Sequence, residues 1–92
     1  MDPLTQLPNI GPVLAENLRK VGIETPEQLR ETGAEEAWRQ IRARVDPGDC
    51  LHQLEALAGA AAGVRKSLLP PERKAALKAF FRDTKNEEQI HV

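Results

Sequence analysis

Few aromatic residues and a single cysteine set the first limits on what this 92-residue sequence can form. The aromatic residues are Trp38, Phe80 and Phe81, so a core must be built mainly from leucine, isoleucine, valine and alanine. Cys50 has no second cysteine, which excludes an internal disulfide and a zinc site built on cysteines. The length suits one small domain over residues 1–92.

Long apolar runs and alternating β-branched segments are also missing. No stretch approaches the roughly 20 apolar residues that a membrane-spanning helix needs. The N-terminus lacks the basic and apolar regions of a signal peptide. Alanine, leucine, glutamate and arginine are abundant and favour helices. We therefore expect a cytoplasmic, all-α protein that does not contact a membrane.

The net charge is close to zero, at −1, but the charges are unevenly distributed. Residues 1–64 carry 10 acidic and 6 basic side chains, and residues 65–92 carry 7 basic and 4 acidic ones. The two parts thus have net charges of −4 and +3, which sum to the total of −1. This balance argues against a protein that coats nucleic acid nonspecifically. The excess of cations lies near the C-terminus.

The stretch from residue 7 to residue 29 predicts a turn, a helix, a second turn and a second helix. Gly11 can enter a tight turn without steric cost, and Pro12 suits the first helical position because no N–H is needed there. Gly22 is typical of a position just past a helix end. Thr25 and Gln28 fit a capping box at the start of the second helix. One apolar face of the first helix would consist of Ile10, Leu14, Leu18 and Val21.

This order of elements resembles the helix-hairpin-helix motif, whose turn usually reads apolar, Pro, Gly, apolar, Gly. Asn9 stands where the motif has its first glycine. Asparagine is the other residue that best tolerates a positive φ, so we predict a left-handed Asn9. In DNA-binding hairpins the backbone N–H groups hold a phosphate, which makes Asn9, Ile10 and Gly11 candidate binding residues. No cation lies from Pro12 to Glu16, where such hairpins usually carry one.

A third helix is predicted after Thr32, which would form a capping box with Glu35. Glu35 and Arg39 have the spacing of a helical ion pair. Trp38 lies on the apolar face, together with Ala34, Ala37, Ile41 and Val45. We expect Trp38 in the core, and an interaction hot spot is the alternative.

A fourth helix is predicted from Cys50 to Ala62. It is apolar or small on nearly all sides, which is typical of a central core helix. One face carries only small residues, Ala56, Gly59 and Gly63, with His52 before them. This face would let another helix approach closely, and a homodimer contact there is the alternative. Cys50 is expected to be a small buried apolar residue.

The last helix is predicted to start at Leu69-Pro70-Pro71-Glu72, because proline suits a first helical turn. Its buried face would consist of Ala76, Leu77, Phe80 and Phe81. A stripe of cations spaced by four, four and three residues consists of Lys74, Lys78, Arg82 and Lys85. This stripe is either a solvated face or a contact for an anionic partner, DNA or an acidic protein surface.

The two ends complete the predicted architecture. Residues 1–6 would form a leading turn capped by Asp2, and the polar residues 84–92 would fray. The whole chain is then a single small bundle of about five helices with an N-terminal helix-hairpin-helix.

No residues form a recognisable catalytic arrangement. His52 and His91 have no second ligand at metal spacing, and no motif places a histidine beside Ser67 or Cys50. We therefore expect no enzyme, no metal and no cofactor.

Taken in order, these segments resemble the C-terminal domain of the TfoX (Sxy) family of competence regulators. The segments are Leu7–Pro12, Val21–Ile23, Leu29–Arg30, Gly33–Ala37, Leu57–Ala60 and Leu69–Lys74. The resemblance implies an all-helical domain with a bacterial regulatory role linked to DNA-uptake genes, without enzymatic activity. Two features depart from the family. Full-length regulators carry an N-terminal α/β domain for which 92 residues leave no room, and relatives have an aromatic near Glu55 and an acid near Ala58.

Two functions follow from these observations. The favoured one is a protein-interaction module in transcriptional regulation, based on the resemblance, the near-neutral charge and the hairpin without cations. The alternative is a nucleic-acid-binding module that contacts the phosphate backbone. It is based on the hairpin, on the basic last helix and on Arg39, Arg42 and Arg44 of the third helix.

Overall fold

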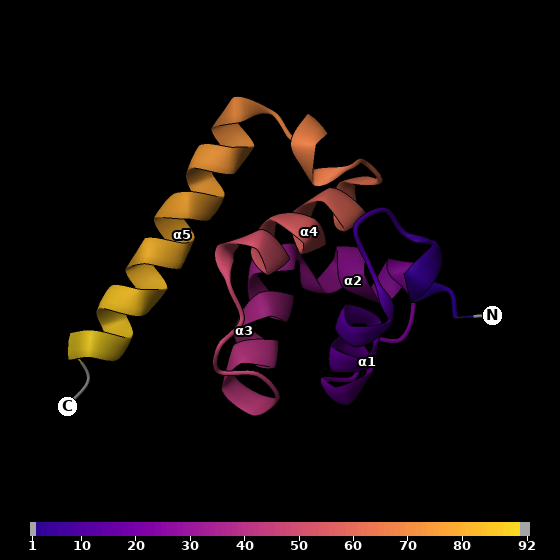
Figure 1. Cartoon of the computed structure of the whole chain (residues 1–92), viewed down its shortest axis with the longest axis horizontal. Helices are drawn as coiled ribbons and strands as arrows, with labels where there is room; N and C mark the ends of the chain where they lie inside the picture. The colour runs from indigo at the N-terminus through magenta and orange to yellow at the C-terminus, as the bar shows by residue number, and fades with distance from the viewer. Residues whose placement is uncertain (1, 91–92) are drawn as a thin grey trace.

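The computed structural model describes residues 2–90, which form five α-helices and two short 3₁₀ helices. In chain order these are η1 (Leu4–Gln6), α1 (Pro12–Lys20), α2 (Pro26–Thr32), α3 (Ala34–Arg44), α4 (Leu51–Ala62), η2 (Lys66–Leu68) and α5 (Pro71–Ile90). No strand occurs in the described residues, so the predicted all-α bundle of five helices is confirmed (Figure 1).

Helix α4 lies at the centre of the bundle, in contact with α2, α3, α5 and η2. Leu54 and Leu57 on this helix have no exposed surface, and Ala58 and Ala60 are also buried. The prediction of a central fourth helix is therefore confirmed. Helices α1 and α5 lie on opposite sides of α3 and α4, with α5 along one edge of the molecule (Figure 1).

The three aromatic residues form one cluster between α3 and α5. Trp38 is fully buried, as predicted, and its indole N–H donates to the carbonyl of Cys50 at 3.2 Å. The rings of Phe80 and Phe81 lie 5.9 and 5.6 Å from the Trp38 ring, measured between centroids. Large aromatic contacts of this kind fix the position of a helix. The cluster thus holds the long α5 against the rest of the bundle.

The glycine after α1 ends that helix as predicted. Gly22 has a φ of +86°, and its N–H donates to the carbonyl of Arg19 at 2.9 Å. The N–H of Ile23 donates to the carbonyl of Leu18, also at 2.9 Å. This pair of bonds is the Schellman arrangement, which satisfies carbonyl groups left free at a helix end.

Polar side chains accept hydrogen bonds from backbone N–H groups at the starts of α2 and η1. The hydroxyl of Thr25 accepts from the N–H of Gln28 at 3.1 Å, as predicted for the start of α2. The Gln28 side chain accepts in return from the N–H of Glu24 at 2.7 Å. In the predicted leading turn, Asp2 accepts from the N–H of Leu4 at 2.9 Å, and Leu4 is fully buried.

The predicted capping box of α3 is wrong. Thr32 is the last residue of α2, and Gly33, with a φ of +85°, is the N-cap of α3. One glycine in this conformation makes the whole turn, so no side-chain cap is used. Glu35 also pairs with Arg73 of α5 and not with Arg39, whose partner is Glu36 at 3.7 Å.

Three expectations about the C-terminal half also differ from the structure. Ala76 is exposed, because the face of α5 that meets the bundle is centred on the fully buried Leu77. Cys50 is exposed, since it precedes the first turn of α4 and does not share the buried face of that helix. The chain is helical from Thr84 to Ile90, where we expected a frayed tail, while positions 91–92 lie outside the described residues.

Candidate interaction surfaces

The hairpin turn before α1 depends on a left-handed asparagine. Asn9 has a φ of +70° and is the one residue other than glycine with a positive φ in the part of the chain that the structure describes. The predicted conformation of Asn9 is confirmed. The assignment of a helix-hairpin-helix motif itself stays an interpretation of this turn.

The side chain of Asn9 forms hydrogen bonds within the domain. Its Nδ2 donates to the carbonyl of Val64 at 3.0 Å and to that of Ala56 at 3.4 Å. Its Oδ1 accepts from the N–H of Lys66 at 3.1 Å. These bonds join the hairpin to the end of α4 and to η2. The Asn9 amide is therefore committed to the fold and is not free to hold a ligand.

A glycine on α4 allows the hairpin to approach this closely. A Cβ on Gly59 would lie 2.5 Å from Asn9 Nδ2 and 2.7 Å from the carbonyl oxygen of Val64. The small face of α4 thus accommodates the hairpin turn and the connector after α4, where we expected another helix. Ala56 and Gly59 are buried, whereas Gly63 is exposed at the helix end. A homodimer contact on this face stays a prediction, and it would require the hairpin to lift from α4.

The other two candidate residues of the hairpin have opposite surroundings. Ile10 is 6% exposed and belongs to the hydrophobic core. Gly11 is exposed and is the N-cap of α1, so it offers no side chain to the N–H groups of the first turn. Gly11 is consequently the most exposed of the three, while Asn9 is half-buried.

A hollow of about 340 Å³ lies beside the exposed end of the hairpin. Its lining residues are Asn9, Gly11, Pro12, Val13 and Leu14 from the hairpin and α1, and His52, Gln53, Ala56 and Lys66 from α4 and η2. Lys66 supplies a cation that the hairpin itself lacks. Lys66 was not predicted from the sequence, since no local signal relates a lysine after α4 to the start of α1.

The predicted stripe of cations lies on α5, and its members differ in how they are used. Lys74 is half-buried and its Nζ donates to the carbonyl of Ser67 at 3.2 Å. Lys85 Nζ lies 5.0 Å above the Phe81 ring, within the range of a cation–π contact. Lys78 and Arg82 are exposed. Helix α5, which carries this stripe, and α1 lie on opposite sides of α3 and α4 (Figure 1).

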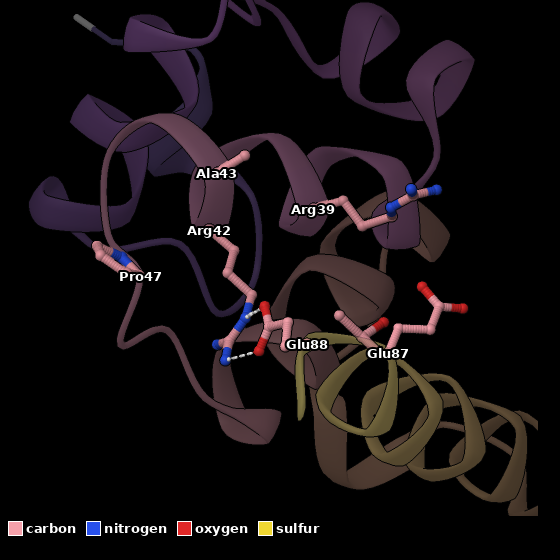
Figure 2. A pocket seen from close by; sticks show the side chains of 7 residues that line it. Arg39, Arg42, Ala43, Pro47, Glu87 and Glu88 are labelled. Carbon is pink, nitrogen blue, oxygen red and sulfur yellow. Dashed lines mark hydrogen bonds and ion pairs between the residues drawn. The ribbon is translucent and has the colours of Figure 1, made fainter. Parts of the chain in front are cut away.

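A second hollow, of about 470 Å³, lies between the end of α3 and the end of α5. Figure 2 shows Arg42 of α3 reaching Glu88 of α5, with Arg39 and Glu87 near the same opening. Arg42 donates to the Glu88 carboxylate through Nε at 2.6 Å and Nη2 at 2.7 Å. It also donates to the carbonyl and carboxylate of Asp49, at 3.0 and 3.2 Å. Arg42 thus connects α3 to α5 and to the loop that follows α3.

Burial controls the charge of Asp49. Its side chain is fully buried, and Oδ2 has no hydrogen-bond partner among the described residues. Burial raises the pKa of Asp49 to about 6, although the hydrogen bond and charge of Arg42 oppose this change. The pKa of Glu88, by contrast, is lowered, mainly by its hydrogen bonds with Arg42.

Comparison with known proteins decides the family. The sequence matches the family model described as TfoX C-terminal domain over residues 1–81. The chain belongs to the TfoX C-terminal domain family. The resemblance inferred from the order of the sequence segments is confirmed. It is not a known enzyme family.

Two solved structures from Listeria monocytogenes resemble this TfoX C-terminal domain. One is a crystal structure of an uncharacterized protein in a triclinic form, 40% identical with a TM-score of 0.87, covering 89% of this chain and 92% of that chain. The other is a protein of unknown function in a tetragonal form, 41% identical with a TM-score of 0.85, covering 88% of this chain and 98% of that chain. A comparison with curated proteins gives no match.

Further structural features of the TfoX C-terminal domain bear on its chemistry. Within residues 2–90, no cluster of histidine, cysteine, aspartate or glutamate side chains has the arrangement of a metal site. None of the described helices is long and apolar enough to cross a membrane. His52 is exposed and lies 3.9 Å from Glu55 on the next turn of α4.

Proposed function

We propose that this TfoX C-terminal domain is a non-enzymatic interaction module that acts in the regulation of transcription, with the genes for DNA uptake as its targets. The observation that carries the proposal is that two of the three candidate hairpin residues are occupied by contacts within the domain. Asn9 is committed to internal hydrogen bonds and Ile10 to the core. The residues that remain on the surface, Gly11, Pro12 and Val13, present an uncharged face that suits a protein partner better than a phosphate.

The ionisable groups of the structure support a role without catalysis. Arg42 joins Asp49 and Glu88, and Arg73 forms a two-bond pair with Glu35 at 2.6 and 2.8 Å. These pairs connect separate segments of the chain, and no histidine, cysteine or serine lines the hollow beside Arg42 and Glu88 in the described structure. Catalysis requires an acid, a base or a nucleophile that converges on one reacting atom.

The regulatory part of the proposal is tested in the host. We expect deletion of the gene to change the transcript levels of DNA-uptake genes, and the intact chain supplied from a plasmid to restore them. Unchanged transcripts in the deletion strain, under conditions in which the protein is expressed, would contradict the regulatory role.

A nucleic-acid-binding module is the second candidate function. The position of Lys66 beside the hairpin favours it, as do the exposed cations Lys78 and Arg82 on α5. Phosphate contacts release counterions, so DNA affinity would fall steeply as salt rises. Fluorescence anisotropy with labelled duplex and single-stranded DNA, over a series of salt concentrations, tests this candidate. Replacing Lys74 and Lys78 by glutamate would abolish binding if the α5 stripe is the contact.

A further inference from the structure

The hollow beside the hairpin combines an exposed apolar side chain with a fixed cation. Val13 is 73% exposed, while its neighbour Leu14 provides the buried contact of this turn of α1. A single exposed valine needs no explanation by itself. Here, however, Val13 borders a hollow of about 340 Å³ whose lining also includes Ala56. Apolar walls of this kind with a few polar groups are typical of binding sites.

Lys66 is held in place by the fold. Its backbone N–H donates to Asn9 Oδ1 at 3.1 Å, and its half-buried side chain lines the hollow. His52 lines the hollow too, and no acidic side chain does so. The acid nearest to this lining is Glu55, whose Oε1 lies 3.9 Å from His52 Nδ1. Lys66 is therefore the one formally charged side chain among the residues that line the hollow.

Further polar groups at this place lack partners. Gln53 lines the hollow, and its Oε1 is buried without a hydrogen bond among the described residues. A buried polar atom without a partner costs free energy. The N–H groups of Val13 and Leu14, in the first turn of α1, receive no cap from the side chain of Gly11.

We infer that this hollow binds a short segment of a partner protein that carries an acidic residue close to an apolar one. The apolar side chain would cover Val13 and Ala56, and the carboxylate would pair with Lys66. This inference rests on the proposed interaction function and adds the location of the contact and the chemistry of the partner.

Charge and shape together favour an acidic protein segment over DNA. A carboxylate beside Lys66 forms a charge-assisted hydrogen bond, which is among the stronger polar contacts. A phosphate backbone would bring no apolar group to cover Val13. It would also meet one lysine and no arginine in the lining of the hollow, whereas DNA-binding surfaces neutralise several phosphates.

Selection from a library of random linear peptides displayed on phage tests the inference directly. We expect the intact domain to enrich peptides with Asp or Glu within a few positions of Leu, Ile, Val or Phe. Lys66→Glu should lose these peptides and select Lys or Arg in place of the acid. Val13→Asp should weaken the binding of a selected peptide by at least roughly tenfold.

Matched variants separate the site from general changes in charge and polarity. Lys78→Glu makes the same charge change on the exposed side of α5, and Leu68→Asp changes the other strongly exposed hydrophobic side chain, which is 69% exposed. We expect both to bind the selected peptides as the intact domain does. Circular dichroism and urea unfolding, followed by the fluorescence of Trp38, check that all four variants fold.

Three results would overturn the inference. The first is a selected set of peptides without an acidic preference. The second is peptide binding that folded Val13→Asp and Lys66→Glu variants retain. The third is binding of labelled duplex DNA at low salt that Lys66→Glu abolishes and Lys78→Glu does not, since the hollow would then bind nucleic acid. The transcript measurement in the deletion strain is independent of all three, so it still tests the regulatory function.

Discussion

Asn9 lies so close to Gly59 that a Cβ on the glycine would come within 2.5 Å of the Asn9 Nδ2 atom. This contact requires both the left-handed conformation of Asn9 and the absence of a side chain on Gly59. Through it, the N-terminal hairpin is joined to the central helix α4 and to Lys66 in η2.

Gly59→Ala is expected to destabilise the domain by about 1–3 kcal/mol, the usual cost of forcing extra atoms into a packed site. In a solvent-exposed helix the same change stabilises by roughly 0.5–1 kcal/mol, so the sign of the effect is diagnostic. Urea unfolding monitored by Trp38 fluorescence measures it. Gly11→Ala is the comparison, because a Cβ there meets no atom within 4 Å and the φ of Gly11 is −91°, so any loss reports the preference of the N-cap for glycine and not a clash. A stabilised Gly59→Ala variant would contradict the close contact with Asn9.

Leu54→Ala is expected to lower the free energy of unfolding by about 2–5 kcal/mol, because Leu54 is fully buried on the central helix. In a domain of this size, such a loss is a large part of the total stability. Leu68→Ala, at a side chain that is 69% exposed, should change the stability by no more than roughly 0.5 kcal/mol. The two unfolding curves are compared in the same buffer. Similar losses for both variants would show that α4 is not the central helix.

The stability of the domain should rise as the pH falls from 7 to 5. The pKa of Asp49 is raised to about 6, so the folded state binds a proton in this range that the unfolded state does not. The expected gain is about 1 kcal/mol. At more acidic pH the trend reverses, because the lowered pKa values of Glu35 and Glu88 make the folded state resist protonation.

Asp49→Asn is the variant that isolates this effect. It keeps an oxygen that can accept from Arg42 and removes the ionisable group, so the rise in stability between pH 7 and pH 5 should disappear. Unfolding in urea at each pH gives the comparison. If the variant retains the full rise, another group titrates in this range and Asp49 is not responsible.

Glu35→Gln should weaken the attachment of α5 by at most about 1 kcal/mol, because the Glu35–Arg73 pair is about one-third exposed. The loss should shrink in high salt, which screens an exposed pair. Glu36→Gln is the matched control, since Glu36 has a longer contact of 3.7 Å with Arg39 on the same helix. A loss for Glu35→Gln that is unchanged in high salt would indicate packing and not charge.

Much of the fold was predictable from local signals. Pro12, Gly22 and Thr25 mark helix ends through backbone geometry and capping bonds that involve neighbours in sequence. The periodic apolar positions of α4 predicted the central helix, and the order of the segments predicted the family. Such signals need no knowledge of the rest of the chain, because the interacting groups are within a few residues of one another.

Two of the failed predictions, on Glu35 and on the C-terminal end of α5, share one physical cause. Glu35 has the spacing to pair with Arg39, yet Arg73 on another helix offers a two-bond pair at 2.6 and 2.8 Å. The polar residues after Thr84 look unfit to form a stable helix, and the structure supplies Arg42 as a partner for Glu88. In each case a contact between distant segments outweighs a weaker local preference.

The sequence by itself determined the helices, the left-handed conformation of Asn9 and the place of Trp38 in the core. Only the tertiary structure decided what those elements do together. It places Lys66 beside a hairpin whose own residues carry no cation. It also pairs Arg42 with the buried Asp49. Backbone conformation and periodicity are properties of neighbouring residues, whereas the charge of a surface depends on which distant side chains the packing places there.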